Sequence, residues 1–215
     1  MRSVDFYEFV GVIVPGAILL VATGYLVDVG AAKEFLLPTG VGNAVAYLVL
    51  AYVTGHLLQA LGNWFENIYW KVWRGMPTDW PITRPEYVES EDWKKIIESY
   101  FGELYKTGET KEWHHIIGQV RSTIYAANRA TRLHIFNGNY GMFRGLVTTE
   151  LLLMVFAWQS HYNLVFVYGI LGVTLILSVA RMHRFAIRYA RELFANIAEL
   201  PTKTRMPVVK GEENA

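Results

Sequence analysis

The sequence has no cysteine and few charged residues, and both shortages narrow what the chain can do. Without cysteine there is no disulfide, no thiolate metal ligand and no cysteine nucleophile. Only 18% of the 215 residues are charged, against about 25% in an average soluble domain. The net charge of +1 provides no overall basic field that would attract nucleic acid. The 53% of hydrophobic residues therefore point to a lipid bilayer as the place of burial.

Four long stretches with almost no formal charge predict four membrane-spanning helices. A helix rises about 1.5 Å per residue, so about 20 apolar residues cross a hydrocarbon core of about 30 Å. The predicted spans are residues 9–27, 41–61, 142–158 and 164–180. Asp5 and Glu8 precede the first span and no cleavage site follows it, which favours a retained span over a signal peptide. Pro15 inside this span predicts a kink whose freed carbonyl a neighbouring helix has to satisfy.

The third and fourth spans are predicted to form a hairpin. Residues 151–180 contain no formal charge, but a polar group lies near their middle: Gln159, Ser160, His161, Tyr162 and Asn163. A turn places this group at the far membrane surface, whereas one helix through residues 144–180 would bury it in hydrocarbon. That single helix would give three spans, and it is the alternative to four.

Lysine and arginine are concentrated on one side of the predicted spans. Of the 20 basic residues, only Lys33 lies outside if both termini are cytoplasmic. Basic residues near membrane spans are retained on the cytoplasmic side. This distribution predicts a protein of the plasma (inner) membrane with both termini in the cytoplasm, whereas three spans would export the arginines of residues 181–191.

The predicted fold is all-α: a polytopic membrane protein with four transmembrane helices, from which helices extend into a cytoplasmic helical domain. The fourth helix should continue past the membrane, because no glycine or proline interrupts it before Pro201. The expected parts are a first transmembrane hairpin (residues 1–62), a cytoplasmic helical insert (63–141), a second transmembrane hairpin (142–180), a basic cytoplasmic helix (181–200) and a flexible tail (201–215).

The insert should begin with membrane-anchoring aromatic residues and continue with two amphipathic helices. The aromatic stretch at the head groups comprises Trp64, Phe65, Tyr69, Trp70 and Trp73. Apolar residues recur at helical spacing over residues 93–104, and a second helix begins near Thr110. Its apolar face comprises Trp113, Ile116, Ile117, Val120 and Ile124. We expect this second helix to end at the turn dipeptide Asn137-Gly138.

The second insert helix carries an Arg-x4-His spacing, formed by Arg129 and His134 beside Asn128. An arginine can bind a phosphate while a histidine transfers a proton during RNA cleavage. The spacing resembles the signature of HEPN ribonucleases, which are helical and usually act as dimers, and that of small CRISPR-associated membrane proteins with a helical cytoplasmic part. The resemblance implies a catalytic role for both residues. Against it, residues five apart on a regular helix point about 140° apart, so one protomer cannot readily aim both at one phosphate.

Two polar residues lie within predicted spans, where a charge is costly to bury. Glu150 is close to the cytoplasmic surface, six residues after Arg144. It is either an interfacial residue that reaches water or pairs with a basic side chain, or part of a transport pathway. His56 is interpreted as making a helix-to-helix hydrogen bond.

A basic stripe follows the fourth span, and its spacing of three, four and three residues places it on one helix face. It comprises Arg181, Arg184, Arg188 and Arg191. We interpret it as a site for anionic lipid head groups, with an acidic protein partner or a nucleic acid backbone as alternatives. No metal or other cofactor is expected, since His114 and His115 lack the one-turn spacing that two ligands on a helix need.

The segment Asp5-Phe-Tyr-Glu-Phe9, with Pro15-Gly16 after it, resembles the opening of small prokaryotic membrane proteins, some encoded beside antiphage-defence genes. The resemblance implies a non-enzymatic membrane sensor or effector that forms a homo-oligomer and forms or gates a pore. The alternatives are a membrane-tethered ribonuclease that uses Arg129 and His134, and a small transporter or lipid-handling protein that uses Glu150 and His56. A cytoplasmic protein partner fits the sensor.

The basic asymmetry predicts where the C-terminus lies. A reporter that is active only in the cytoplasm should be active when it is fused after Ala215, because a cytoplasmic C-terminus retains nearly all basic residues inside. A reporter that is active only in the periplasm is the matched control, and it should be inactive when it is fused after Ala215. The reverse pattern would rule out four spans with both termini inside.

Overall fold

The computed structural model describes residues 6–26, 41–87, 95, 97–99, 110–158 and 163–198. Every regular element in these residues is helical. Four helices are long and apolar enough to cross a membrane: Tyr7–Leu26, Val41–Val72, Thr131–Ala157 and Leu164–Ile197. The chain is therefore an all-helical polytopic membrane protein, which confirms the predicted fold class.

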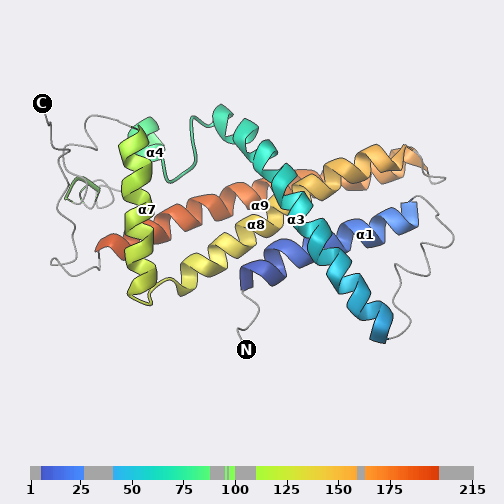
Figure 1. The fold of residues 1–215 in the computed structure, drawn as a ribbon. Helices are drawn as coiled ribbons and strands as arrows, with labels where there is room; N and C mark the ends of the chain where they lie inside the picture. Colours follow the sequence, from blue (N-terminus) through green and yellow to red (C-terminus); the bar gives the residue numbers. More distant parts are fainter. Residues whose placement is uncertain are drawn as a thin grey trace, which may run out of the picture. The chain divides into compact units, whose positions relative to one another are not determined.

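The helices form two compact units (Figure 1). In chain order the elements are the π-helix η1 (Tyr7–Ile13), α1 (Val14–Leu26), α3 (Val41–Val72), α4 (Trp80–Thr83), the short η2 (Pro85–Tyr87), α7 (Thr110–Ala126), α8 (Thr131–Ala157) and α9 (Leu164–Ala198). Unit 1 spans residues 1–76 and 131–189, and unit 2 spans 77–130 and 190–215. These boundaries differ from the expected insert of residues 63–141, because α3 and α8 continue as helices beyond their apolar stretches.

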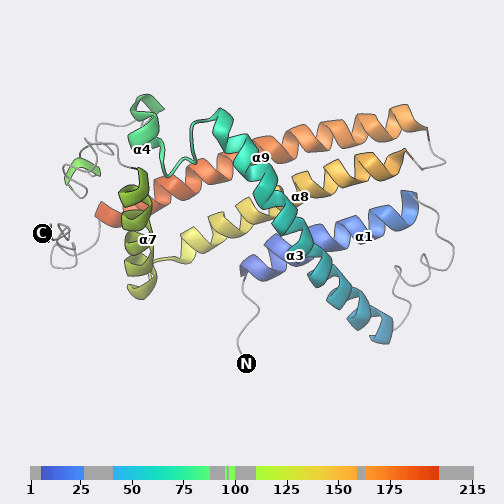
Figure 2. The same cartoon turned by 45° about the horizontal axis from the view of Figure 1, so that its top comes forward.

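In unit 1, α3 crosses α1 and α8 obliquely (Figure 2), and glycine lets the backbones meet. A Cβ added to Gly16 of α1 would lie 2.0 Å from the Ala51 carbonyl oxygen of α3. One added to Gly55 of α3 would lie 2.1 Å from the Val12 carbonyl oxygen. Small residues at such a crossing allow the two backbones to touch without side chains between them, which is common where membrane helices pack.

The prediction that a helix ends at Asn137-Gly138 is wrong, because α8 runs unbroken through both residues. A Cβ on Gly138 would lie 2.7 Å from the Phe6 ring, so this glycine makes room for η1. The turn occurs earlier. Asn128 has a φ of 59°, the left-handed conformation of a helix C-terminus, and the Arg129 N–H donates to the Ile124 carbonyl oxygen.

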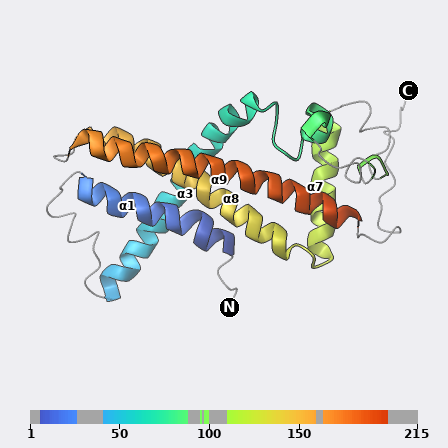
Figure 3. The same cartoon turned by 180° about the vertical axis from the view of Figure 1, so that it is seen from behind.

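α8 and α9 form the predicted hairpin, so a single helix through residues 144–180 is wrong. The Asn163 side chain caps α9 by accepting from the Val165 N–H at 3.0 Å. Beyond the turn, Leu153 and Ala157 of α8 pack with Leu171 of α9 in one apolar cluster. Figure 3 shows the two helices side by side along unit 1. The polar residues 159–162 between them lie outside the described residues.

Unit 2 contains α4, η2, α7 and the end of α9. The predicted apolar face of α7 is confirmed, with Trp113, Val120 and Ile124 buried. The Trp113 indole N–H donates to the Thr78 carbonyl oxygen at 2.9 Å, and its ring lies 6.3 Å from that of Phe194 in α9. Most of the helix expected over residues 93–104 lies outside the described residues.

The glycine crossing gives a stability prediction. Gly55→Ala should lower the free energy of unfolding in detergent by about 1–3 kcal/mol, because the new methyl group would overlap the η1 backbone at Val12, which has to move away. Gly169→Ala in α9 is the matched control, since its added Cβ meets nothing within 4 Å. Equal thermal unfolding midpoints for the two variants would contradict the close crossing.

Candidate functional site

A buried amide, Gln59 of α3, lies where η1, α3 and α8 meet. Its Nε2 donates to the Gly11 carbonyl oxygen of η1 and, at 2.9 Å, to the Gly141 carbonyl oxygen of α8. Its Oε1 accepts from Arg144, from Nε at 3.1 Å and also from Nη2. Both N–H donors and the carbonyl of this amide are therefore used, as a polar group in an apolar interior requires.

The bond to Gly11 follows from the position of Pro15. In an α-helix the N–H of residue 15 would donate to the Gly11 carbonyl oxygen, but proline has no N–H. The segment before the proline is π-helical, and Gln59 supplies the missing donor from the neighbouring helix. The predicted need for a neighbour to satisfy the freed carbonyl is thus met by a side chain.

Arg144 extends this arrangement into an ion pair with Glu66 of α3. The side chains are only 12% and 14% exposed. Nη2, which also donates to Gln59, lies 3.5 Å from the Tyr7 hydroxyl of η1. We call Tyr7, Gln59, Glu66 and Arg144 the polar hub. Burying such a pair costs desolvation energy, and removing one partner leaves the other charge buried and unpaired. Because its members lie on η1, α3 and α8, the hub holds these three helices in one arrangement.

An aromatic cluster in the same unit surrounds His183 of α9. Its Nδ1 lies 3.0 Å from the Tyr69 hydroxyl, and its ring centroid lies 5.4 Å from that of Trp70 and 4.6 Å from that of Trp73. The predicted anchoring role therefore does not hold for Trp70, which is 4% exposed, although Trp64 is 71% exposed and free to face head groups. Trp70 also donates to the Tyr140 hydroxyl at 2.9 Å.

Glu150 is buried between α8 and α9. Its Oε1 accepts from the Ser178 hydroxyl at 3.0 Å, while Oε2 has no hydrogen-bond partner among the described residues. Of the alternatives for this residue, pairing with a basic side chain is not seen among the described residues: Arg144 is six residues away on another face of α8 and bonds to Glu66 instead.

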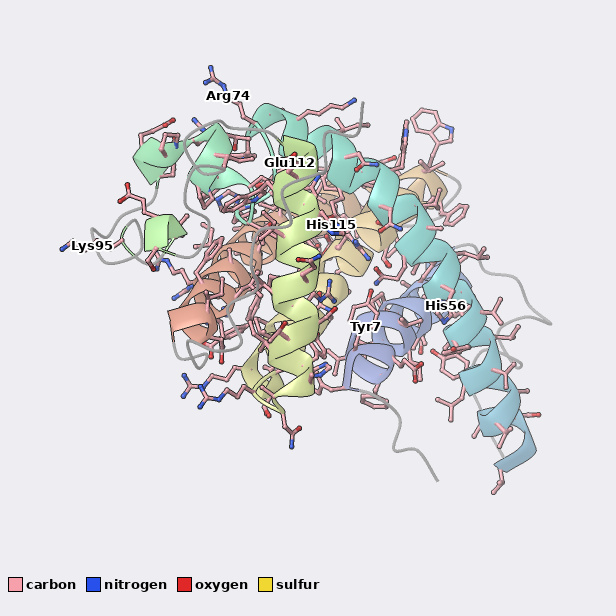
Figure 4. The ribbon with its side chains drawn as sticks, turned by 60° about the vertical axis from the view of Figure 1, so that its left-hand side comes forward. Tyr7, His56, Arg74, Lys95, Glu112 and His115 are labelled. Carbon is pink, nitrogen blue, oxygen red and sulfur yellow. The ribbon has the colours of Figure 1, made fainter. Side chains whose placement is uncertain are left out.

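Within the described residues of one chain, His56 does not make the predicted helix-to-helix hydrogen bond. Its ring is exposed on α3 (Figure 4) and meets the edge of the Tyr52 ring of the same helix, 4.5 Å away. Among the described residues it has no hydrogen-bond partner.

The two residues of the ribonuclease-like spacing belong to different units. Arg129 follows the end of α7 in unit 2, and His134 lies in the first turn and a half of α8 in unit 1. The prediction that one regular helix carries both is wrong, because α7 ends at Ala126. The argument from helical spacing against their cooperation therefore no longer applies.

The basic stripe lies on α9. Arg181, Arg184 and Arg191 are exposed, whereas the Arg188 guanidinium lies 5.8 Å from the centre of the Phe185 ring and is half-buried. Three of the four arginines thus keep the exposure that a head-group site requires.

The chain matches no protein-family model, and no curated protein or solved structure is significantly similar to it. Among the described residues, no group of three or more histidine, aspartate or glutamate side chains could hold a metal ion. The candidate site is therefore the polar hub, which is defined by geometry alone.

Sequence reasoning missed the hub. Gln59 lies inside a predicted span, and Glu66 follows it by seven residues, which is two helical turns on one face. That spacing, together with a proline in the neighbouring span, was a signal for an internal polar contact.

The ion pair of the hub predicts a non-additive mutational effect. Arg144→Met should destabilise the protein by about 3–5 kcal/mol, because Glu66 would stay buried without its partner. Replacing both Arg144 and Glu66 with methionine should recover the part of this loss that comes from the unpaired Glu66 charge, since no buried charge remains, while the Gln59 carbonyl lacks its Arg144 donors in both variants. Arg181→Met, at an exposed position, serves as the control and should change the unfolding free energy little. Additive effects in this double-mutant cycle would contradict the pairing.

Proposed function

We propose that the chain is a non-enzymatic membrane sensor and effector, in which unit 2 receives a cytoplasmic signal and the membrane helices of unit 1 respond by forming or gating a pore as a homo-oligomer. One observation carries the proposal: α9 is a single helix from Leu164 to Ala198 that belongs to both units. An uninterrupted helix of 35 residues, about 52 Å long, transmits displacement along its length.

The first part of α9 packs within unit 1, and its last part packs within unit 2. Residues 164–189 belong to unit 1 and contact α8 through Ser178, which donates to Glu150, and through Phe185, whose ring stacks 5.6 Å from that of Phe143. Residues 190–198 contribute Leu193 and Phe194 to the buried interior of unit 2. A partner that reshapes unit 2 would therefore change the force on unit 1.

Exposed apolar surface supports the oligomer. In the most apolar stretch of α9 only 6% of the residues are buried, and in that of α3 only 22%. Lipid covers part of such a surface, and further copies of the chain can cover the rest. In the proposal, the polar hub holds the closed state, because breaking the Arg144 and Glu66 pair would leave charged groups that favour a water-filled opening.

A specific observation favours the transporter as the second candidate. Glu150 is 8% exposed, and its Oε2 has no hydrogen-bond partner among the described residues. Ionisable groups buried within spans often mark substrate or proton pathways. Proton-dependent uptake into vesicles that Glu150→Gln abolishes would favour this reading over the pore.

Dye release from liposomes tests the pore. Reconstituted wild-type protein should release little dye, and Glu66→Gln should release at least several-fold more, because the weakened pair no longer holds the closed state. Glu112→Gln is the matched control: Glu112 is an exposed acid of α7, remote from the hub in the sequence (Figure 4). Release that is equal in all three samples would count against the pore.

Incubation with RNA separates the proposal from the ribonuclease alternative. We expect no cleavage by the wild type, and hence no effect of Arg129→Ala or His134→Ala. Robust cleavage that both substitutions abolish would replace the sensor with a membrane-tethered ribonuclease.

A further inference from the structure

One face of α3 carries a stripe of exposed residues at the spacing of a helix-pairing seam. The spacing alternates between three and four residues, with one extra step of four, as in left-handed helix pairs. All lie within about 40° of His56 at about 100° per residue. The stripe, called here the α3 seam, consists of Gly42, Val45, Val49, Tyr52, His56, Ala60, Asn63 and Asn67, and every member is exposed.

The α3 seam lies on the outer side of unit 1. In Figure 1, α3 passes in front of α1 and α8, and in the reverse view of Figure 3 it passes behind them. Its opposite face holds the buried residues, including Ala51, Gly55 and Leu58. The seam therefore lies within the broader surface of α3 that the rest of unit 1 leaves uncovered.

The polar members of the α3 seam have no hydrogen-bond partners among the described residues. His56 lies within the predicted span of residues 41–61 and precedes Asn63 by seven residues, which is about 10 Å along the helix. An imidazole is too short to reach head groups from there, and lipid chains offer no hydrogen bond. Leaving a neutral polar group unsatisfied in hydrocarbon costs about 2–7 kcal/mol.

We propose that the α3 seam pairs with the α3 seam of a second copy of this chain. The proposal rests on the homo-oligomer of the proposed function and names its contact surface. Copies inserted by the same route share one orientation, so the two helices run parallel about a two-fold axis along the membrane normal. Each seam residue then faces its own counterpart.

This pairing satisfies His56 in a way that lipid cannot. Neutral imidazole has one N–H donor and one nitrogen acceptor, so His56 of one copy can donate to His56 of the other at the same depth. Asn63 and Asn67 meet their counterparts in the same way, since an amide is both donor and acceptor. Ala60 and Gly42 keep the backbones close, as small residues do in membrane helix pairs.

Disulfide cross-linking tests the surface directly, because the chain has no cysteine of its own. Single cysteines are placed on the seam at Val45, Val49 and Ala60, and off the seam at Leu50, Leu57 and Leu61, which are also exposed. Oxidation of the full-length protein in native membranes should give at least five-fold more covalent dimer at the seam positions. Equal yields at both sets would overturn the proposal, as would seam yields that fall to the off-seam level when the lipid-to-protein ratio is raised.

Substitution of His56 tests the hydrogen bond. The dimer fraction in lipid at fixed protein density should fall at least five-fold in His56→Phe and stay near wild type in His56→Asn, which retains a donor and an acceptor. An unchanged fraction in His56→Phe would overturn the pairing through His56. Dye release by Glu66→Gln without preferential cross-linking at the seam would refute the α3 seam while leaving the pore proposal intact. Preferential seam cross-linking without dye release by Glu66→Gln would refute the pore alone.

Discussion

The arrangement of unit 1 depends on one requirement: a carbonyl that proline leaves without a donor has to be satisfied inside an apolar environment. Pro15 removes the donor for Gly11, and Gln59 of α3 replaces it. The replacement works only if α1 and α3 lie close together, which Gly16 and Gly55 allow. Because the same amide also binds Gly141 and Arg144, the solution to one local defect positions a third helix as well.

The two kinds of contact restrain the helices differently. At the glycine crossing the backbones of the helices are in direct contact, with no flexible side chain between them. The helices therefore cannot easily slide past one another. The Arg144 and Glu66 pair acts through charge and depends on both partners. In the proposed function, unit 1 would therefore respond through a stiff crossing and a polar contact that either holds or breaks, which is the behaviour expected of a two-state element.

Helix positions could be predicted from the sequence because they depend on local composition: apolar length, the polar break at residues 159–163, and the apolar face of α7. The meaning of single residues could not be predicted where it depends on a partner. Gly138 is compatible with a turn, and only its contact with Phe6 shows that it serves packing. Arg144 and Glu66 lie 78 positions apart, so no periodicity connects them. The sequence predicts a hydrogen-bond partner for His56 on a neighbouring helix. That its side chain is exposed instead becomes visible only when the packing of α3 against the other helices is known.

The crossing of α1 and α3 also gives α3 the geometry of a lever. The fulcrum lies near Ala51 and Gly55, so the arm toward Val41 is about 18 Å long and the arm toward Val72 about 29 Å, at about 1.5 Å per residue. Tilting about this point moves the two ends in opposite directions, and the end with Trp70 travels about one and a half times as far as the end at Val41. A small displacement at the Val41 end of α3 is therefore enlarged at the Val72 end.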